Sequence, residues 1–584
     1  MKKITTKTKN TALNSMLSCL VIASMLVVMQ VPALGAPRAG ADPSVPFGTA
    51  GTDPEQIFQL TIRTTASNTT FLLPTSGYLD GVATEKPYDW AIDWGDGNDE
   101  EAEGLSANMS GIAHSYSAAG NYTITITPNG STEAWLAAFG FAISQYDANT
   151  LENKARVTGV LTPLRPEMTR TAAQLDYSEA PPSYELAYLF FECANLTKAP
   201  TLEGWENISV VGDYFAYDMY SACTSLAMLN DGIYLPADLL TAGDSFAENI
   251  FWGCTSLDLS VSSFNLPQSL MTVGDNFAVA LFQGCTSLST LADGFNLPQG
   301  LVSIGNGYCM RMFYNCSKLS TLPDGFNMPQ SVSEVGNDYA NSMFYGCSSL
   351  TSLPDGFNLT QHIGEAGNGF AALMFSGCSS LQGLPEGFTF PQTMDKVGDF
   401  FAMTMFSGCM SLGALPAGFN LPQNVVVTGG QFAMFMFMTA GSPTFQINEE
   451  FCFPAGIGSD AVNAFYMAFA LSPLAPAQNR TAASIIGGCP TPADARMTFD
   501  AHFSDQDYIA LNWGGKGLTP PVGAPGTGDL NGDGYVTMDE VMTTAQAAMG
   551  DIGLSPEQLA CIDIDGDGYI TMADVLMIYQ MAIL

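Results

Sequence analysis

The sequence is poor in charged residues, and basic residues are the scarcest. Charged side chains make up 13 % of the 584 residues, about half the share of an ordinary soluble protein, and 56 acids face 18 bases. The formal net charge is −38 and no basic patch is present, which argues against nucleic acid and anionic membrane surfaces as partners. Cations, and calcium in particular, suit such a chain as partners.

Histidine is also scarce, and the few copies lie in no nucleophile or metal motif: His114, His362 and His502. CxxC pairs are missing as well, so a zinc site is not expected. A glycosidase needs two positioned carboxylates. The regularly repeated acids fall instead in Pro-Asp-Gly-like turns, where turn chemistry explains them: Asp293, Asp324, Asp355 and Glu386. The sequence therefore predicts no catalytic residue and a protein that is not an enzyme.

A second apolar run of membrane-spanning length is missing, and the one apolar run is of export length. Four lysines among the first nine residues precede an apolar stretch at 17–31, and small residues follow at 33–35 and 39–41. This order is typical of a secretory signal peptide over residues 1–41, cleaved between about residues 35 and 41. The alternative is a retained N-terminal anchor. After cleavage we expect no membrane span and a secreted, cell-surface-associated protein.

A 31-residue unit recurs through the middle of the chain. A cysteine begins each copy, and after a first spacing of 30 residues every further spacing is 31. Adding 31 again leads to Ala440 and then Leu471, which are also apolar. A fixed period of this length indicates a solenoid, in which each unit buries its apolar face against its neighbours. The leading cysteines are Cys193, Cys223, Cys254, Cys285, Cys316, Cys347, Cys378 and Cys409.

Each unit is expected to contain a strand, a turn, a loop and a short helix. In the copy that begins at Cys347, residues 349–353 are an extended run that the turn residues 354–356 end. Apolar residues at offsets 0, 1, 4, 5 and 8 from Phe370 fit one face of a helix, with Asn368 as a plausible N-cap. The same N-cap place is held in other copies by Asn306, Asn337 and Asp399.

The string MF-x-G-C-x-S-L, preceded by V-G-[ND]-x-F-A, resembles the BspA-type (Treponema-type) leucine-rich repeats of bacterial surface proteins. The resemblance covers about residues 157–515. It implies a leucine-rich-repeat α/β solenoid, which we assign to residues 161–515.

The repeated cysteines are expected to form a buried column of free thiols. Equivalent positions of a solenoid stack on one another, and free Cys behaves as a small hydrophobe. Disulfides are the alternative, because cysteines in a secreted protein often pair.

A separate β module is expected over residues 54–130, joined to the repeats by a connector at 131–160. Apolar and polar residues alternate over 88–94 and again over 120–126, as in half-buried strands. The pair WGDG … HSYSAAGNYTITI resembles the PKD family of immunoglobulin-like β-sandwiches. That resemblance implies a spacer or a ligand-binding module, with His114 as a framework residue.

A linker rich in Pro and Gly, at 516–528, leads to two twelve-residue acidic loops. Calcium takes six to eight oxygen ligands, and each loop offers side-chain oxygens at positions 1, 3 and 5, a backbone carbonyl at 7 and a carboxylate at 12. Two calcium ions are therefore expected. The candidate ligands are Asp529, Asn531, Asp533, Tyr535 and Glu540 in the first loop, and Asp563, Asp565, Asp567, Tyr569 and Asp574 in the second.

Two such loops, each followed by a helix and the first without an entering helix, resemble a type I dockerin over residues 529–584. The resemblance implies calcium-dependent binding to a cohesin module of a scaffold protein. In that family, loop positions 10 and 11 touch the cohesin. Here these positions are Met538, Asp539, Met572 and Ala573.

The sequence thus predicts a multidomain, mixed protein, with a β-sandwich, a solenoid of about 31-residue repeats and a small α-helical dockerin. We expect a secreted, non-catalytic binding or adhesion protein fixed to a cohesin-bearing scaffold, whose solenoid engages a host protein or polysaccharide. The alternatives are a structural spacer in such an assembly and a polysaccharide-degrading solenoid enzyme.

Overall fold

The structure is a computed structural model. It describes residues 57–74, 88–105, 111–128, 135–136, 139–141, 150–170, 172–175, 180–229, 235–260, 264–442, 445–448, 450–454, 464, 468–469, 526, 528, 530, 536, 538–549, 554, 556–564, 569–571, 574–575 and 577–578. The expected signal peptide, most of the linker at 516–528, the last repeats beyond residue 469 and His502 lie outside these ranges. No helix in the described ranges is long and apolar enough to cross a membrane.

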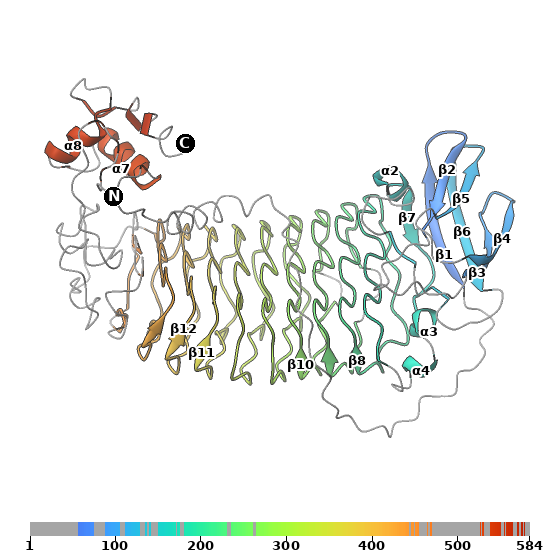
Figure 1. Ribbon diagram of the computed structural model, residues 1–584, viewed down its shortest axis with the longest axis horizontal. Helices are drawn as coiled ribbons and strands as arrows, with labels where there is room; N and C mark the ends of the chain where they lie inside the picture. The colour runs from blue at the N-terminus through green and yellow to red at the C-terminus, as the bar shows by residue number, and fades with distance from the viewer. Residues whose placement is uncertain are drawn as a thin grey trace, which may run out of the picture. The chain divides into compact units, whose positions relative to one another are not determined.

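The N-terminal part, called the β module here, contains two antiparallel sheets (Figure 1). A five-stranded sheet has the order β4-β3-β6-β1-β7, and β2 pairs with β5 in the second sheet. The strands are β1 Phe58–Thr64, β2 Thr69–Leu73, β3 Tyr88–Asp93, β4 Asp99–Leu105, β5 Ile112–Tyr116, β6 Gly120–Pro128 and β7 Val157–Val160.

The alternating segments of the β module form strands, as predicted. Trp90 and Ile92 on β3 and Ile124 and Ile126 on β6 are buried, while the residues between them are more exposed. Because successive side chains of a strand point to opposite faces, this alternation places one face of the sheet in the core. Buried side chains of both sheets belong to one apolar cluster.

Residues 131–160 are not only a connector. β7 pairs with β1 and is the edge strand of the five-stranded sheet, and the Val160 N–H donates to the Lys198 carbonyl of the first repeat at 2.9 Å. The helix α2 Leu151–Lys154 precedes β7, and Thr150 caps it by accepting from the Asn153 N–H. The β module therefore continues by hydrogen bonding into the repeats. Two further short helices follow, α3 Pro166–Thr169 and α4 Ala172–Leu175.

The repeats, described between residues 180 and 454 and called the repeat array here, stack as successive turns of chain (Figure 1). Two-residue strands pair in parallel with the same place one repeat on, as Thr241 does with Thr272. The 31-residue period in the sequence is therefore also the period of the backbone contacts. The strands are β8 Val210–Val211, β9 Thr241–Ala242, β10 Thr272–Val273, β11 Glu365–Ala366, β12 Lys396–Val397 and β13 Val427–Thr428.

The extended run predicted at 349–353 contributes isolated bonds rather than a strand. The Thr351 N–H donates to Ser320 at 3.1 Å, and the Gln382 N–H donates to the Thr351 carbonyl at 3.0 Å. The repeat thus carries its two-residue strand just before the glycine at 367, and not after the cysteine, where the sequence pattern placed it.

The helix predicted at 370–378 is wrong. Alternate N–H groups bond locally, as the Met374 N–H does to the Ala371 carbonyl, while the Leu373 N–H donates to Met403 of the next repeat at 2.8 Å. Ala371 and Leu373 have positive φ angles of 54° and 56°, which an α-helix does not contain. No helix occurs among the described repeats of 180–454, so the α/β label is corrected to turns and short parallel strands.

Three aromatic columns and one cysteine column fill the interior of the array. In one column the rings of Phe313, Phe344 and Phe375 stack with centroids 5.4 and 5.5 Å apart. Every leading cysteine is free and fully buried, and from the second onwards each thiol donates to a carbonyl of the preceding repeat, as Cys347 does to Phe313 at 3.1 Å. Ala440 continues the column as a buried residue. The prediction of a buried column of free thiols is confirmed.

Asx side chains bond each repeat to the next at a position where helix caps were predicted. The Asn337 Oδ1 accepts from the Asn368 backbone N–H, and the Asn368 Oδ1 accepts from the Asp399 N–H, both at 2.8 Å. These side chains therefore accept from a backbone N–H of the neighbouring repeat and do not cap a helix.

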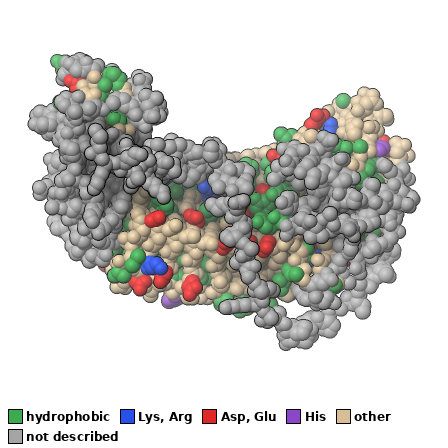
Figure 2. All heavy atoms as spheres, in the orientation of Figure 1, with side chains coloured by type: hydrophobic (Ala, Val, Ile, Leu, Met, Phe, Trp, Pro, Cys, Tyr) green, Lys and Arg blue, Asp and Glu red, His purple; other side chains and the backbone are tan. Residues whose placement is uncertain are grey.

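Acidic side chains lie at several places on the visible face of the array (Figure 2).

The C-terminal segment, described in part between residues 526 and 578, contains α7 Met538–Met549 and α8 Pro556–Ile562. Leu530, Val541, Ile562, Val575 and Ile578 form its small apolar core. Ala545 and Ala548 pack against this core, as the helical spacing after the first loop predicts.

Candidate functional sites

The last residues of the two acidic loops are buried carboxylates. Glu540 is 3 % exposed at the start of α7, and Asp574 is fully buried. α7 holds Glu540 because the apolar face of that helix, which includes Val541, packs into the core of the segment. A buried carboxylate is unfavourable unless it is hydrogen-bonded, paired or bound to a metal.

Asp574 organises the second loop through its two oxygens. Oδ1 accepts from the Ile564 N–H at 2.9 Å, and Oδ2 accepts from the Thr571 N–H at 2.9 Å and from its hydroxyl at 3.2 Å. The carboxylate therefore ties position 2 of the loop to position 9. The sequence indicated Asp574 as a ligand, but the backbone contacts that orient it were not predicted.

The composition of the segment leaves these carboxylates without a side-chain cation of their own. Residues 526–584 contain ten acids and no Lys, Arg or His. Carboxylate and carbonyl oxygens are the ligands that calcium prefers, so the residues present fit this ion, which would supply the missing positive charge.

The structure describes four of the ten predicted ligands. Glu540, Asp563, Tyr569 and Asp574 lie in described ranges, and Tyr569 is 73 % exposed, as a residue that contributes only its backbone carbonyl can be. Among described residues, no group of three acidic, His or Cys side chains is close enough to hold a metal. The other predicted ligands lie outside the described residues: Asp529, Asn531, Asp533, Tyr535, Asp565 and Asp567.

The predicted cohesin-contacting positions are only partly placed. Met538 and Asp539 lie on the first turn of α7. Met572 and Ala573 lie outside the described residues.

Helices follow the loops as predicted, and one also enters the second loop. α7 begins at position 10 of the first loop, and residues 574–575 and 577–578 are helical after the second loop. α8 ends directly before Asp563, where an entering helix of an EF-hand would lie. The Gly528 N–H donates to the Cys561 carbonyl at the end of α8 at 2.9 Å, which joins the start of the first loop to the second.

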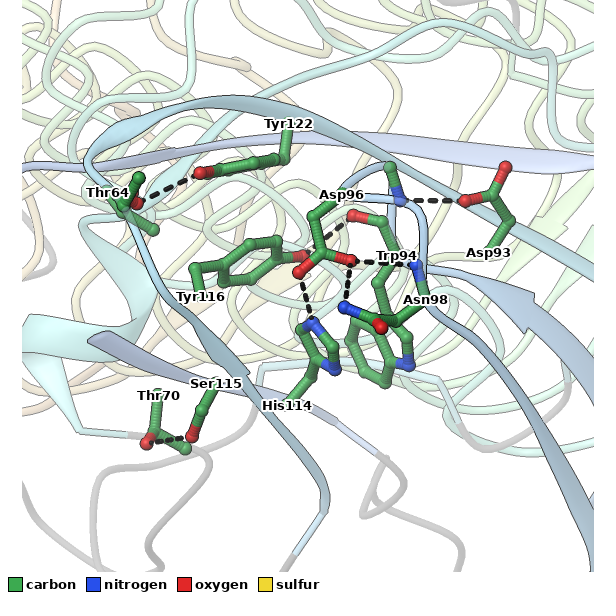
Figure 3. Close-up of polar contacts among 12 residues, drawn as sticks. Thr64, Thr70, Asp93, Trp94, Asp96, Asn98, His114, Ser115, Tyr116 and Tyr122 are labelled. Carbon is green, nitrogen blue, oxygen red and sulfur yellow. Dashed lines mark hydrogen bonds and ion pairs between the residues drawn. The ribbon is translucent and has the colours of Figure 1, made fainter. Parts of the chain in front are cut away.

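The β module has its own polar site around the Trp94–Gly97 turn (Figure 3). The Asp96 Oδ2 lies 2.9 Å from the His114 Nε2, and its Oδ1 accepts from the Asn98 side chain at 3.1 Å. The His114 ring stacks on Trp94 with centroids 4.6 Å apart. Gly95 has a φ angle of +74°, and a Cβ there would meet the Thr123 carbonyl oxygen.

These contacts fix the turn to β5 rather than build a reactive centre. Burial alone would raise the pKa of Asp96, but hydrogen bonds from His114 and Asn98 outweigh it and hold the pKa below its usual value. An ionised Asp96 is therefore the form that the turn favours. The Tyr116 hydroxyl donates to the Trp94 carbonyl at 3.1 Å, so Tyr116 also joins β5 to this turn.

Sequence reasoning missed a second side-chain ladder in the array. The Asn327 Oδ1 accepts from the Asn358 N–H at 2.8 Å, and the Asn327 side-chain amide donates to the Gly356 carbonyl at 3.0 Å. The signal was present as an asparagine repeated at 31-residue spacing after Gly-Phe. From the sequence, that loop was expected only to contribute apolar residues.

The C-terminal segment is thus a small helical module built on two acidic loops. Residues 527–581 match the family model described as "Dockerin type I domain". Type I dockerins bind calcium, and dockerins bind cohesin-bearing scaffold proteins. The match covers the C-terminal part of the chain only.

Two solved structures are similar to part of the chain. One is a leucine-rich repeat protein from Eubacterium ventriosum, 13 % identical, with 51 % of this chain and 77 % of that chain covered and a TM-score of 0.25. The other is a leucine rich cell surface protein from Faecalibacterium prausnitzii, 18 % identical, with 43 % and 66 % covered and a TM-score of 0.20. No curated protein matches the chain.

Proposed function

We propose that this protein is a secreted, non-catalytic binding protein that its C-terminal segment attaches to a cohesin-bearing scaffold. The observation that carries the proposal is the dockerin match over 527–581, in a segment that buries the loop carboxylates Glu540 and Asp574 and contains no basic residue. Two calcium ions, one in each loop, would satisfy the two carboxylates. The PKD-like β module and the solenoid then hold a binding surface away from the scaffold.

The exposed acids of the array support a binding role over a catalytic one. Asp293, Asp324, Asp355 and Glu386 are all solvent-exposed and occupy the same turn in successive repeats. Acid–base catalysis requires a carboxyl group held beside a positioned partner, whereas these four side chains lie in exposed turns. These acids therefore fit a hydrophilic turn better than an active site.

Calorimetric titration of the full chain against a panel of cohesin modules, with calcium and then with chelator, tests this proposal. We expect at least one cohesin to bind with calcium and none to bind with chelator. Binding that survives chelation, or the absence of binding to every cohesin, would contradict it. Release of shortened glycans during incubation with polysaccharides would point instead to the alternative of a polysaccharide-degrading enzyme.

A further inference from the structure

A chain of aromatic rings crosses the first repeats of the array. Tyr184 stacks on Tyr214 with centroids 4.3 Å apart, and Tyr214 contacts Tyr217 edge to face at 5.6 Å. Tyr217 contacts Tyr188 at 5.4 Å, and Tyr188 contacts Phe191 at 5.7 Å. These rings belong to the first described repeats, at the N-terminal end of the array.

A lysine of the protein already occupies one end of this cluster. The Lys154 Nζ lies 2.8 Å from the Glu192 Oε2 and 4.6 Å from the centroid of the Phe191 ring. Its side chain, which comes from α2 of the β module, is fully buried. The cluster can therefore bury a lysine between a carboxylate and an aromatic ring, an arrangement that favours an ammonium group.

The next two repeats present carboxylates beside the rings without such a lysine. The Asp218 N–H donates to the Glu248 carbonyl at 3.0 Å, so the two residues are neighbours across the repeat boundary. Asp218 is 8 % exposed, and the Glu248 Oε2 is buried without a hydrogen-bond partner. None of the ion pairs among the described residues includes Asp218 or Glu248.

Burial raises the pKa of both carboxyl groups to about 7, and the charges of Glu248 and Glu192 contribute to the shift of Asp218. Both groups therefore change charge near neutral pH. Glu192, which is paired with Lys154, acts on Asp218. The Tyr217 phenol lies beside both carboxyls, and the Tyr214 phenol lies beside Glu248.

We propose that Asp218 and Glu248, beside Tyr217 and Tyr188, bind a lysine side chain of a protein partner. The bound ammonium would lie between carboxylates and aromatic rings, as the Lys154 ammonium lies beside Glu192 and Phe191. It would supply the hydrogen-bond donor that the Glu248 Oε2 lacks. The inference rests on the proposed binding role of the array and names the chemistry of its partner.

The charge of the whole protein favours such a partner. A formal net charge of −38 attracts basic proteins at long range, and the cluster then provides a short-range contact. Anionic ligands are disfavoured by the same charge.

Binding of a labelled lysine-rich peptide to the full chain at pH 8 tests the proposal. We expect Glu248→Gln and Asp218→Asn each to weaken binding about tenfold or more, while the matched control Asp355→Asn, an exposed acid of the same array, leaves it unchanged. The peptide with acetylated ε-amino groups should not bind. Equal losses in the control and the two variants, or no binding at all, would overturn the proposal.

The wild-type protein gives a second test that requires no substitution. Because a lysine favours the ionised carboxylates, binding at pH 7 should release protons and should weaken at pH 5.5. Calorimetry in two buffers of different ionisation enthalpy measures the release, and zero release would contradict the assignment. Tighter binding of spermine or of a glucosamine oligomer than of the peptide would overturn the assignment to a protein partner.

Cohesin binding measured on the same samples separates the two proposals. Lost peptide binding with intact calcium-dependent cohesin binding would reject only the lysine site.

Discussion

The repeat array and the C-terminal segment satisfy their polar groups in opposite ways. In the array, Asn337 and Asn368 accept from the N–H groups of the next repeat, so each unit completes its neighbour. In the C-terminal segment, Glu540 and Asp574 are buried among residues that include no basic side chain. We therefore expect the array to be stable through its own repetition and the segment to depend on a cation from solution.

Loss of a loop carboxylate should give the largest effect on binding, because it removes both a proposed calcium ligand and a fold contact. Asp574→Asn lowers the negative charge of the second loop while keeping a similar side-chain shape. We expect calcium affinity to fall by about tenfold or more and cohesin binding to weaken with it. Calorimetry with calcium measures the change, and Asp551→Asn, outside both loops in the sequence, is the control. Equal affinities for the two variants would show that Asp574 is not a ligand.

Within the array, truncation of a stacked ring should destabilise strongly. Phe344 is fully buried between Phe313 and Phe375, so Phe344→Ala leaves a cavity that costs about 3–5 kcal/mol. Denaturant unfolding measures the loss. Met410→Ala, at a position 62 % exposed on the same array, should have little effect. Similar losses for both would mean that the ring column is not the core of the array.

A methyl group added beside Asn337, one of the Asx side chains that bond neighbouring repeats, tests whether these bonds stabilise the array. A Cβ on Gly367 would lie 2.6 Å from the Asn337 Oδ1 and 2.8 Å from its backbone nitrogen. Gly367→Ala should therefore cost about 1–3 kcal/mol. A Cβ on Gly364 meets nothing within 4 Å, so Gly364→Ala is the matched control and should be close to neutral. The opposite order of stabilities would contradict the observed ladder geometry.

The smallest effect is expected in the β module and depends on pH. Because the pKa of Asp96 is lowered in the folded state, its stabilising contribution is complete above the usual carboxyl range and is lost as pH falls through the folded pKa. Asp96→Asn should reduce stability by about 1 kcal/mol at pH 7 and by less at pH 3. Thermal unfolding of both proteins at the two pH values measures this, and a larger difference at pH 3 would reverse the assigned sign.

The sequence was sufficient for the period, two strands of the β module (β3 and β6) and the thiol column. The period follows from the cysteine spacing, and the alternation around Trp90 and Ile124 specifies which strand face is buried. The helix at 370–378 failed for a physical reason. In the turns of the array two residues face inward and two outward, a period of about four that nine residues cannot distinguish from 3.6.

The sequence could not predict the hydrogen bonds that orient Asp574 or the backbone contact between Asp218 and Glu248. Both depend on which segments of the chain the fold brings together. Asp574 meets Ile564 ten residues earlier in the chain, and Asp218 meets Glu248 through the bonding between repeats. The cysteine spacing gave the repeat register. It did not show which of the outward-facing side chains become buried. The burial of these acids was therefore visible only in the structure.

Thiol labelling of the full chain, with and without calcium, tests the contrast between the two regions most directly. Cys561 is buried in the C-terminal segment, whereas Cys316, Cys347 and Cys378 are buried in the array, where burial raises the pKa of Cys316 to about 12. Mass spectrometry after alkylation should show every one of these cysteines protected in calcium. In chelator, Cys561 should become labelled while the array cysteines stay protected. Protection of Cys561 in chelator, or labelling of the array cysteines together with it, would contradict the account.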